Sequence, residues 1–152
     1  MAQSTDPTTL LNAATDRTLA LAETWLRWDG RPFVTDDNER IYTPHKAIRR
    51  YADHLLDHLA QTQALLSGAE TIPDEWRASL VTLESDWAHF TEADLREAQQ
   101  RIRRLTQTYV LVLQACSADE LDRERGQDVW TLREIVEHVA SPWYAEQVGD
   151  RS

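Results

Sequence analysis

The sequence has one cysteine, Cys116, and only four glycines and five prolines among its 152 residues. A single cysteine cannot build an intramolecular disulfide framework, so disulfide-stapled secreted scaffolds are excluded. The first ten residues lack a basic segment followed by a long apolar one, and no apolar run approaches the roughly 18–20 residues of a spanning helix. We therefore expect a cytoplasmic protein without a membrane partner.

Positive charge is also scarce, because 16 lysines and arginines stand against 26 acidic residues and the formal net charge is −10. Such an acidic chain repels phosphate backbones, so binding of nucleic acid would need a local basic patch. The short groups Arg49/Arg50 and Arg101/Arg103/Arg104 are too small for one. We expect no nucleic-acid partner.

Apolar residues recur at steps of three and four, which together with the scarcity of glycine and proline predicts an all-α protein of one domain, residues 1–152. Capping residues are expected at Asp6, Thr43, Thr91 and Thr131. The predicted helices cover residues 7–28, 44–67, 91–116 and 131 onward, with a less regular helical stretch over 73–90. Loops are predicted at 31–42 and 117–130, and Pro142 should interrupt the last helix, with Ser141 as a new cap.

Two segments of the chain resemble each other: 42–52 and 130–140 both read as an aromatic residue, a threonine cap and an amphipathic helix. They are too far apart for a solenoid repeat, but they suit two helix pairs related by a pseudo-twofold axis.

The segments YTPHKAIRRYADHLLDHL (42–59) and WTLREIVEHVASPWYAEQV (130–148) resemble the two signature segments of the DinB/YfiT-like superfamily. The resemblance implies a DinB-like up-down-down-up four-helix bundle with short extra helical segments, often dimeric. In metal-containing members it implies a divalent ion held by one histidine of the second helix and a His-x-x-x-His pair of the last. Members with known activity include transferases and isomerases that use mycothiol or bacillithiol.

Carried over residue by residue, the family's three ligands fall on Arg50, His138 and Pro142, so one of three is a histidine here. A guanidinium cannot deprotonate to bind a metal, and its charge repels a divalent ion. The family metal site therefore looks decayed in this chain.

Other histidines offer an alternative ligand set. His54 and His58 are four residues apart on one predicted helix, a spacing that suits Zn²⁺ or Ni²⁺. The pseudo-repeat predicts that His54 approaches His138, with His58 about one turn further along, roughly 5–6 Å. The alternative interpretation is structural: all three are histidines at the boundary between core and solvent, bonded to neighbouring carboxylates.

The remaining candidates are weaker. Cys116 lies on a predicted core stripe, where a thiol is usually a small hydrophobe, and His45 and His89 lie near helix starts. Trp28, Trp143 and Tyr144 lie near the ends of elements, where an aromatic pocket or a dimer surface could form, although burial in the core is the commoner role.

Two hypotheses follow. The first is a DinB-like protein of unassigned activity, a small-molecule-binding or regulatory homodimer with a decayed metal site and no cofactor. The alternative is a metal-dependent thiol S-transferase or isomerase that uses His138 with His54 and His58 to hold Zn²⁺ or Ni²⁺.

Overall fold

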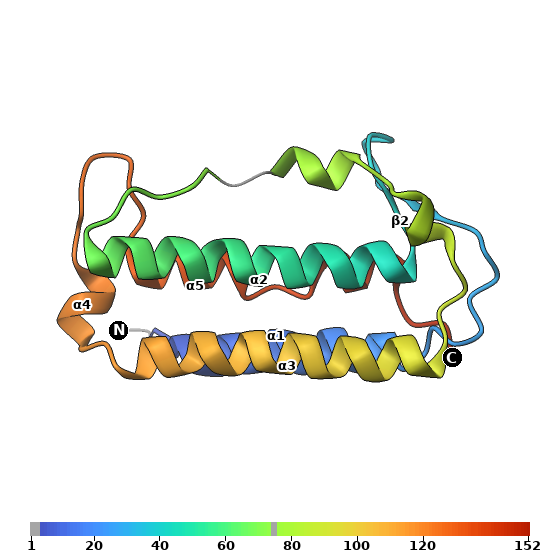
Figure 1. Ribbon diagram of the computed structural model, residues 1–152, viewed down its shortest axis with the longest axis horizontal. Helices are drawn as coiled ribbons and strands as arrows, with labels where there is room; N and C mark the ends of the chain where they lie inside the picture. The colour runs from blue at the N-terminus through green and yellow to red at the C-terminus, as the bar shows by residue number, and fades with distance from the viewer. Residues whose placement is uncertain (1–3, 74–75) are drawn as a thin grey trace.

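The computed structural model describes residues 4–73 and 76–152, and it is built mainly of helices (Figure 1). The helices are α1 (Pro7–Ala22), α2 (Pro44–Ser67), α3 (Glu92–Gln114), α4 (Ala118–Asp122), α5 (Leu132–Val139) and α6 (Trp143–Val148). Two 3₁₀ helices, η1 (Trp76–Leu80) and η2 (Glu84–Trp87), lie between α2 and α3. Within the described residues, strands are confined to the pair β1 (Phe33–Val34) and β2 (Ile41–Tyr42). The predicted all-α class is confirmed.

The long helices α1, α2 and α3 run alongside one another, with α3 in contact with both α1 and α2 (Figure 1). The α5–α6 segment packs against the same two helices, α1 and α2. Helix α2 therefore has a different neighbour on each side, α3 and the α5–α6 segment. None of the described helices is both long enough and apolar enough to cross a membrane.

The predicted caps hold the helix starts. The Asp6 side chain accepts from the Thr9 N–H and that of Thr43 from the Lys46 N–H. Thr91 opens α3 with a reciprocal capping box. At its other end α2 stops at Gly68, which takes the left-handed conformation (φ 67°) that glycine adopts without strain.

The core contains buried hydrogen-bonded hydroxyl groups among its apolar side chains. Thr15 Oγ1 lies 2.7 Å from Thr106 Oγ1 and 3.0 Å from the Tyr51 hydroxyl, which joins α1, α2 and α3. Thr62 and Tyr109 make a second such pair, 2.8 Å apart, between α2 and α3. These bonds satisfy polar groups that would otherwise be costly to bury.

The first helix is shorter than predicted, because α1 ends at Ala22 rather than near Trp28. Trp25 and Trp28 lie in the turns that follow, where the N–H of each bonds three residues back, to Ala22 and Trp25. Both indoles are buried, and Trp25 Nε1 donates to the Gly149 carbonyl at 2.8 Å. The helical spacing of Trp25 and Trp28 indicated that both side chains are buried. Residues in turns can be buried in the same way, so the spacing did not require a helix.

The predicted helical stretch over 73–90 is wrong in detail, since the described part of it contains only η1 and η2. Leu80, Leu83 and Trp87, expected on a buried stripe, are each more than 40% exposed. The side chain of Trp76 and residues 74–75 lie outside the described residues.

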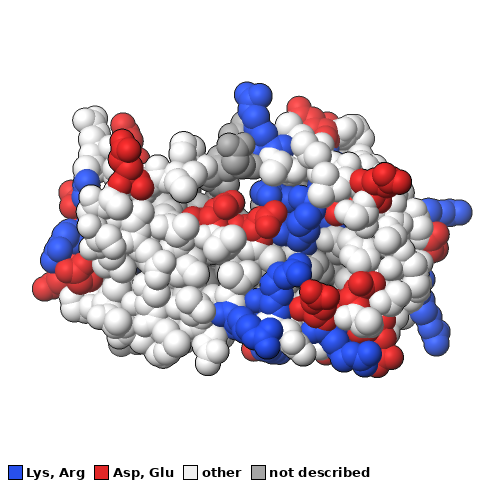
Figure 2. Space-filling view, in the orientation of Figure 1, with Lys and Arg blue, Asp and Glu red and all other residues white. Residues whose placement is uncertain are grey.

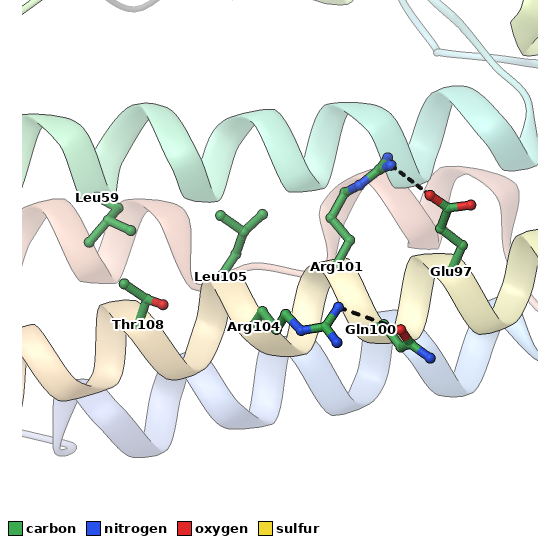
Figure 3. A pocket seen from close by; sticks show the side chains of 7 residues that line it. All are labelled: Leu59, Glu97, Gln100, Arg101, Arg104, Leu105 and Thr108. Carbon is green, nitrogen blue, oxygen red and sulfur yellow. Dashed lines mark hydrogen bonds and ion pairs between the residues drawn. The ribbon is translucent and has the colours of Figure 1, made fainter.

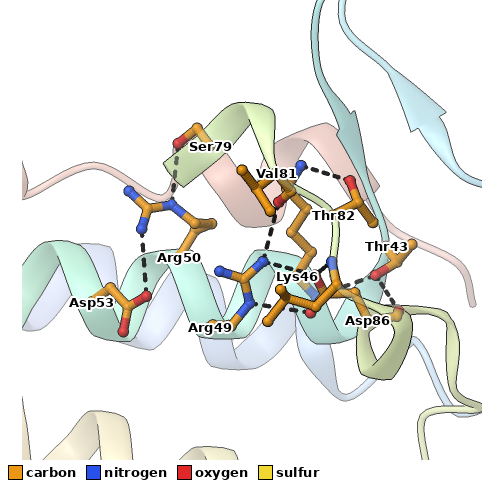
Figure 4. Close-up of polar contacts among 10 residues, drawn as sticks. Thr43, Lys46, Arg49, Arg50, Asp53, Ser79, Val81, Thr82 and Asp86 are labelled. Atoms are coloured by element: carbon orange, nitrogen blue, oxygen red, sulfur yellow. Dashed lines mark hydrogen bonds and ion pairs between the residues drawn. The ribbon is translucent and has the colours of Figure 1, made fainter. Parts of the chain in front are cut away.

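A polar network fastens this segment to the start of α2 (Figure 4). Arg49 donates to both carboxylate oxygens of Asp86, at 3.1 and 2.7 Å, and Asp86 is almost fully buried. The buried Lys46 ammonium donates to Thr82 Oγ1 at 3.0 Å, and Arg50 Nε donates to Ser79 Oγ at 3.1 Å. Polar side chains take the place of the predicted apolar stripe in this contact.

Two other segments predicted as loops contain short regular elements. The β1–β2 hairpin lies within 31–42, with Phe33 paired to Tyr42 and Asn38 in the left-handed conformation. Ser117 caps the five-residue α4 within the predicted loop 117–130. The predicted interruption at Pro142 is confirmed: α5 ends at Val139, α6 begins at Trp143, and Ser141 Oγ accepts from the Trp143 N–H at 3.3 Å.

Candidate metal centre

Three histidines from two helices meet where α2 faces α5. His54 and His58 lie one turn apart on α2, and His138 is the penultimate residue of α5. One ring nitrogen of each lies within 4.8 Å of the other two, and His54 Nε2 is 3.1 Å from His138 Nε2. The fold brings together the three residues that the sequence singled out, and we call them the histidine trio.

Helix α5 presents His138 to α2 because its start and its apolar face are both fixed. In the capping box, the Thr131 N–H donates to Glu134 Oε2 at 2.7 Å, and the Glu134 N–H donates to Thr131 Oγ1 at 3.2 Å. The fully buried side chains of Ile135, Val136 and Val139 then fix the rotation of the helix. His138 follows on the rim of that buried face, and its side chain reaches α2.

The trio spans the boundary between core and solvent: His58 is buried, His54 is half-buried and His138 is exposed. Burial lowers the pKa of His54 to about 3, and the neighbouring His58, His138 and Arg50 add to the effect. His54 is therefore neutral at pH 7 and keeps a lone pair for a metal. His58 Nδ1 lies 2.8 Å from Gln61 Oε1; with the amide oxygen accepting, Nδ1 holds the proton and Nε2 carries the lone pair.

These residues fit a zinc or nickel ion. Two imidazole nitrogens bound to one tetrahedral Zn²⁺ at 2.0–2.1 Å are about 3.3 Å apart, close to the 3.1 Å between His54 and His138. Neutral imidazole is a favoured ligand of Zn²⁺ and Ni²⁺. Three such ligands leave at least one coordination position for a water molecule or a substrate.

Arg50 precedes His54 by one turn of α2, and its guanidinium is engaged elsewhere. It donates to Ser79 and lies 3.4 Å from Asp53, so it is held toward η1 (Figure 4). Pro142 lies between α5 and α6, and its side chain has no atom that could bind a metal ion. The trio therefore shares His138 with the positions carried over from the family, whereas His54 and His58 lie outside them.

Two cavities adjoin the trio. One, of about 400 Å³, is lined by residues of the trio, the hairpin and the start of α6: Arg40, His54, His138, Ser141, Trp143 and Tyr144. The other, of about 340 Å³, is lined by residues of α2, of α5, of the segment that follows α2 and of the segment that precedes α5: Asp57, His58, Gln61, Thr71, Ile72, Pro73, Trp130 and His138. An ion on the trio would be reached from both.

A larger cavity, of about 550 Å³, lies between α2 and α3 (Figure 3). Its charged side chains are already engaged: Arg101 pairs with Glu97 at 3.1 Å, and Arg104 lies 3.5 Å from Gln100. In Figure 2 the basic side chains gather near the middle of the face, with acidic side chains close by. Among the described residues, no cluster of three metal-binding side chains lines this groove.

The other sequence candidates lie apart from the trio. Burial, then the nearby Glu120, raises the pKa of the Cys116 thiol, which makes it a poor nucleophile. His45 is at the start of α2, where its Nε2 lies 3.2 Å from the His89 carbonyl oxygen and 3.6 Å from Asp94. These two histidines connect the starts of α2 and α3.

Trp143 and Tyr144 line the 400 Å³ cavity beside the trio, as expected for an aromatic pocket, whereas Trp28 is buried and does not line it. Sequence reasoning missed Arg40 and Gln61. Gln61 could have been found, because residues three apart on a helix are neighbours. Arg40 could not, since it reaches the site only through the hairpin.

A scan of protein-family models, a search of curated proteins and a search of solved structures all find no match for this chain.

Proposed function

We propose that the histidine trio binds one divalent transition-metal ion, Zn²⁺ or Ni²⁺, and that the protein is a metal-dependent thiol S-transferase. The observation that carries the metal site is the convergence of three ring nitrogens within 4.8 Å, from two separate helices. The choice of a thiol as the nucleophile rests on the resemblance to the DinB/YfiT-like superfamily. The same resemblance is the ground for proposing an up-down-down-up four-helix bundle and a homodimer.

The hydrogen bond of His54 favours this hypothesis over that of a boundary histidine bonded to a carboxylate. The hydrogen-bond partner of His54 is another imidazole, His138, rather than an acid. Three imidazole rings lie with their centroids 4.6 to 5.0 Å apart, an arrangement that a shared cation would stabilise. Gln61 lies outside the cluster and its amide oxygen orients the His58 ring, as hydrogen-bond partners of metal-binding histidines do.

Each residue has a distinct role in this proposal. His54, His58 and His138 would hold the ion, and Gln61 would fix the tautomer of His58. The bound ion would supply Lewis acidity, which lowers the pKa of a thiol or water on the open position. The aromatic side chains of Trp143 and Tyr144 would shield the reacting group from bulk water.

The test is metal titration of protein made without a histidine tag and stripped of metal, by calorimetry with Zn²⁺ and with Ni²⁺. We expect one ion per chain, and a loss of at least about 100-fold in affinity in His54→Ala and in His138→Ala. His45→Ala and His89→Ala are matched controls, because they remove histidines outside the trio, and they should bind like the parent. Failure of the parent to bind either ion would favour the decayed-site hypothesis of a metal-free small-molecule-binding or regulatory protein.

The proposed activity has its own measurement. The zinc-loaded protein should accelerate the reaction of a low-molecular-weight thiol with monochlorobimane, in which the sulfur–carbon bond forms and chloride leaves. His138→Ala should lose this acceleration. If the zinc-loaded protein leaves the rate unchanged with both mycothiol and bacillithiol, the proposed metal site stands and the proposed thiol transferase activity is wrong.

The homodimer can be tested by light scattering at tens of micromolar. Leu56 on α2 and Leu111 on α3 are 52% and 58% exposed, and both are large apolar side chains. A mass near twice 17.5 kDa is expected. A mass of one chain would contradict the proposed association.

A further inference from the structure

We propose that the 400 Å³ cavity beside the trio is a binding site for a small organic carboxylate with a flat apolar body. The site combines a cation at one side, aromatic walls and the metal ligands, all from different elements. This inference deepens the proposed function by naming the class of substrate, and its anion site can be tested without the metal.

Arg40 supplies the cationic side. It stands directly before β2, and its guanidinium carbon lies 5.0 Å from the centroid of the Trp143 ring. Its ion pair, with Asp37 at 3.4 Å, is partly exposed to water, so the pair is weak. A planar guanidinium stacked near an aromatic ring can still present two parallel N–H groups to a carboxylate.

Aromatic rings make the walls. Trp143 and Tyr144 open α6 with their ring centroids 5.4 Å apart, and Tyr42 lies within 5.5 and 5.8 Å of them. The Tyr144 ring is also 5.7 Å from that of His54, which brings the aromatic wall up to the trio. Tyr42 is fully buried and does not line the cavity, so a flat apolar group between Arg40 and the trio would be in contact with the Trp143 and Tyr144 rings.

The charges around the 400 Å³ cavity favour an anionic ligand. No acidic side chain lines this cavity among the described residues, although the whole chain has a net charge of −10. The buried Arg50 guanidinium lies 5.9 Å from the Tyr144 ring, and its partner Asp53 does not line the cavity. The neighbouring 340 Å³ cavity differs, because Asp57 lines it. An anion is therefore directed to the side of the trio where Arg40 lies.

The expected position of the ligand follows from these groups. The carboxylate would accept from Arg40, the flat body would lie on Trp143 and Tyr144, and the other end would point to the trio. Ser141 Oγ, which accepts from the Trp143 N–H, has a hydroxyl proton to donate to a polar substituent.

The experiment compares phenylacetate with phenylacetamide, its neutral isostere, by calorimetry on the metal-free protein. Phenylacetate should bind at least about 10-fold more tightly, and Arg40→Gln should remove that preference. Arg31→Gln is the matched control, since this arginine is 88% exposed and lies outside the cavity. Trp143→Ala should weaken both ligands.

The outcomes separate the two proposals. Equal affinity for the two probes, or a preference that survives Arg40→Gln, would overturn the carboxylate site. A preference that appears only in the zinc-loaded protein and persists in Arg40→Gln would also overturn it, because the carboxylate would then be bound to the metal. A protein that prefers phenylacetate through Arg40 but does not bind Zn²⁺ would keep the carboxylate site and lose the proposed metal centre.

Discussion

Helix α2 buries titratable side chains at two places, and their surroundings differ in kind. In its first turns, Lys46, Arg49 and Arg50 each reach an oxygen atom of the segment 79–86. One turn beyond Arg50, His54 meets a second imidazole instead. Hydrogen bonds and ion pairs between unlike groups hold a loop to a helix, whereas a gathering of imidazole nitrogens suits a metal cation. The comparison separates a structural polar cluster from a candidate functional one.

The largest expected effect comes from the structural cluster. Asp86→Ala removes the carboxylate that accepts two hydrogen bonds from Arg49, and it leaves Arg49 near the buried Lys46 without that acid. We expect a loss of about 3 kcal/mol in the free energy of unfolding, measured with urea. Zinc affinity should stay unchanged. The control Asp16→Ala removes the partner of Arg103 in a pair that is exposed at both ends, and it should cost less than about 1 kcal/mol. Equal losses in the two variants would contradict the account of this cluster.

The next effect belongs to the trio. Gln61→Leu removes the amide oxygen 2.8 Å from His58 Nδ1, and zinc affinity should fall by about 10- to 100-fold. The free energy of unfolding of the metal-free protein should change little, since Gln61 is only half-buried. Gln63→Leu, at an exposed position of the same helix, provides the control. Calorimetry that gives the same zinc affinity for both variants would show that Gln61 does not position the ligand.

A smaller effect tests whether the start of α5 matters to the trio. Thr131→Ala and Thr91→Ala each remove the threonine of a capping box, so each should cost about 1 kcal/mol in thermal or urea unfolding. Only Thr131→Ala should also weaken zinc binding, because α5 carries His138. A similar decrease in zinc affinity for Thr91→Ala would mean that general loosening, rather than the position of α5, is measured.

The smallest effect is a pH dependence at Lys46. Burial, and then the nearby Arg49, lower the pKa of this ammonium from 10.5 to about 8. Between those values the unfolded chain binds a proton that the native protein does not, so this lysine's contribution to stability rises with pH. The stability of the parent relative to Lys46→Met should therefore increase from pH 8 to about pH 8.6, by less than about 0.8 kcal/mol. Urea unfolding that gives a pH-independent difference would contradict the lowered pKa.

The helix ends were predictable because short local signals determine them. Thr43 and Gly68 bound α2 as the sequence indicates, and Thr131 with Glu134 opens α5. The end of α1 was missed because Trp25 and Trp28 have helical spacing, yet the long-range bond from Trp25 to Gly149 is made from a turn. A contact of that kind cannot be read from neighbouring residues.

The site was predictable in part for the same reason. The spacing of His54 and His58 is a local feature, and the pseudo-repeat placed His138 opposite His54. The approach of His58 to His138 within the trio, and the arrival of Arg40 beside Trp143, depend on how α5 and the hairpin pack. Packing of that kind is set by the whole core.

The most direct test of the trio as a metal centre is zinc K-edge X-ray absorption on the untagged protein with one equivalent of Zn²⁺. The proposed site predicts three imidazole nitrogens at about 2.0–2.1 Å and one further light atom. The imidazole scattering should fall in His138→Ala. A spectrum with fewer than two imidazoles, or one that His138→Ala leaves unchanged, would contradict the claim that His54, His58 and His138 together hold the ion.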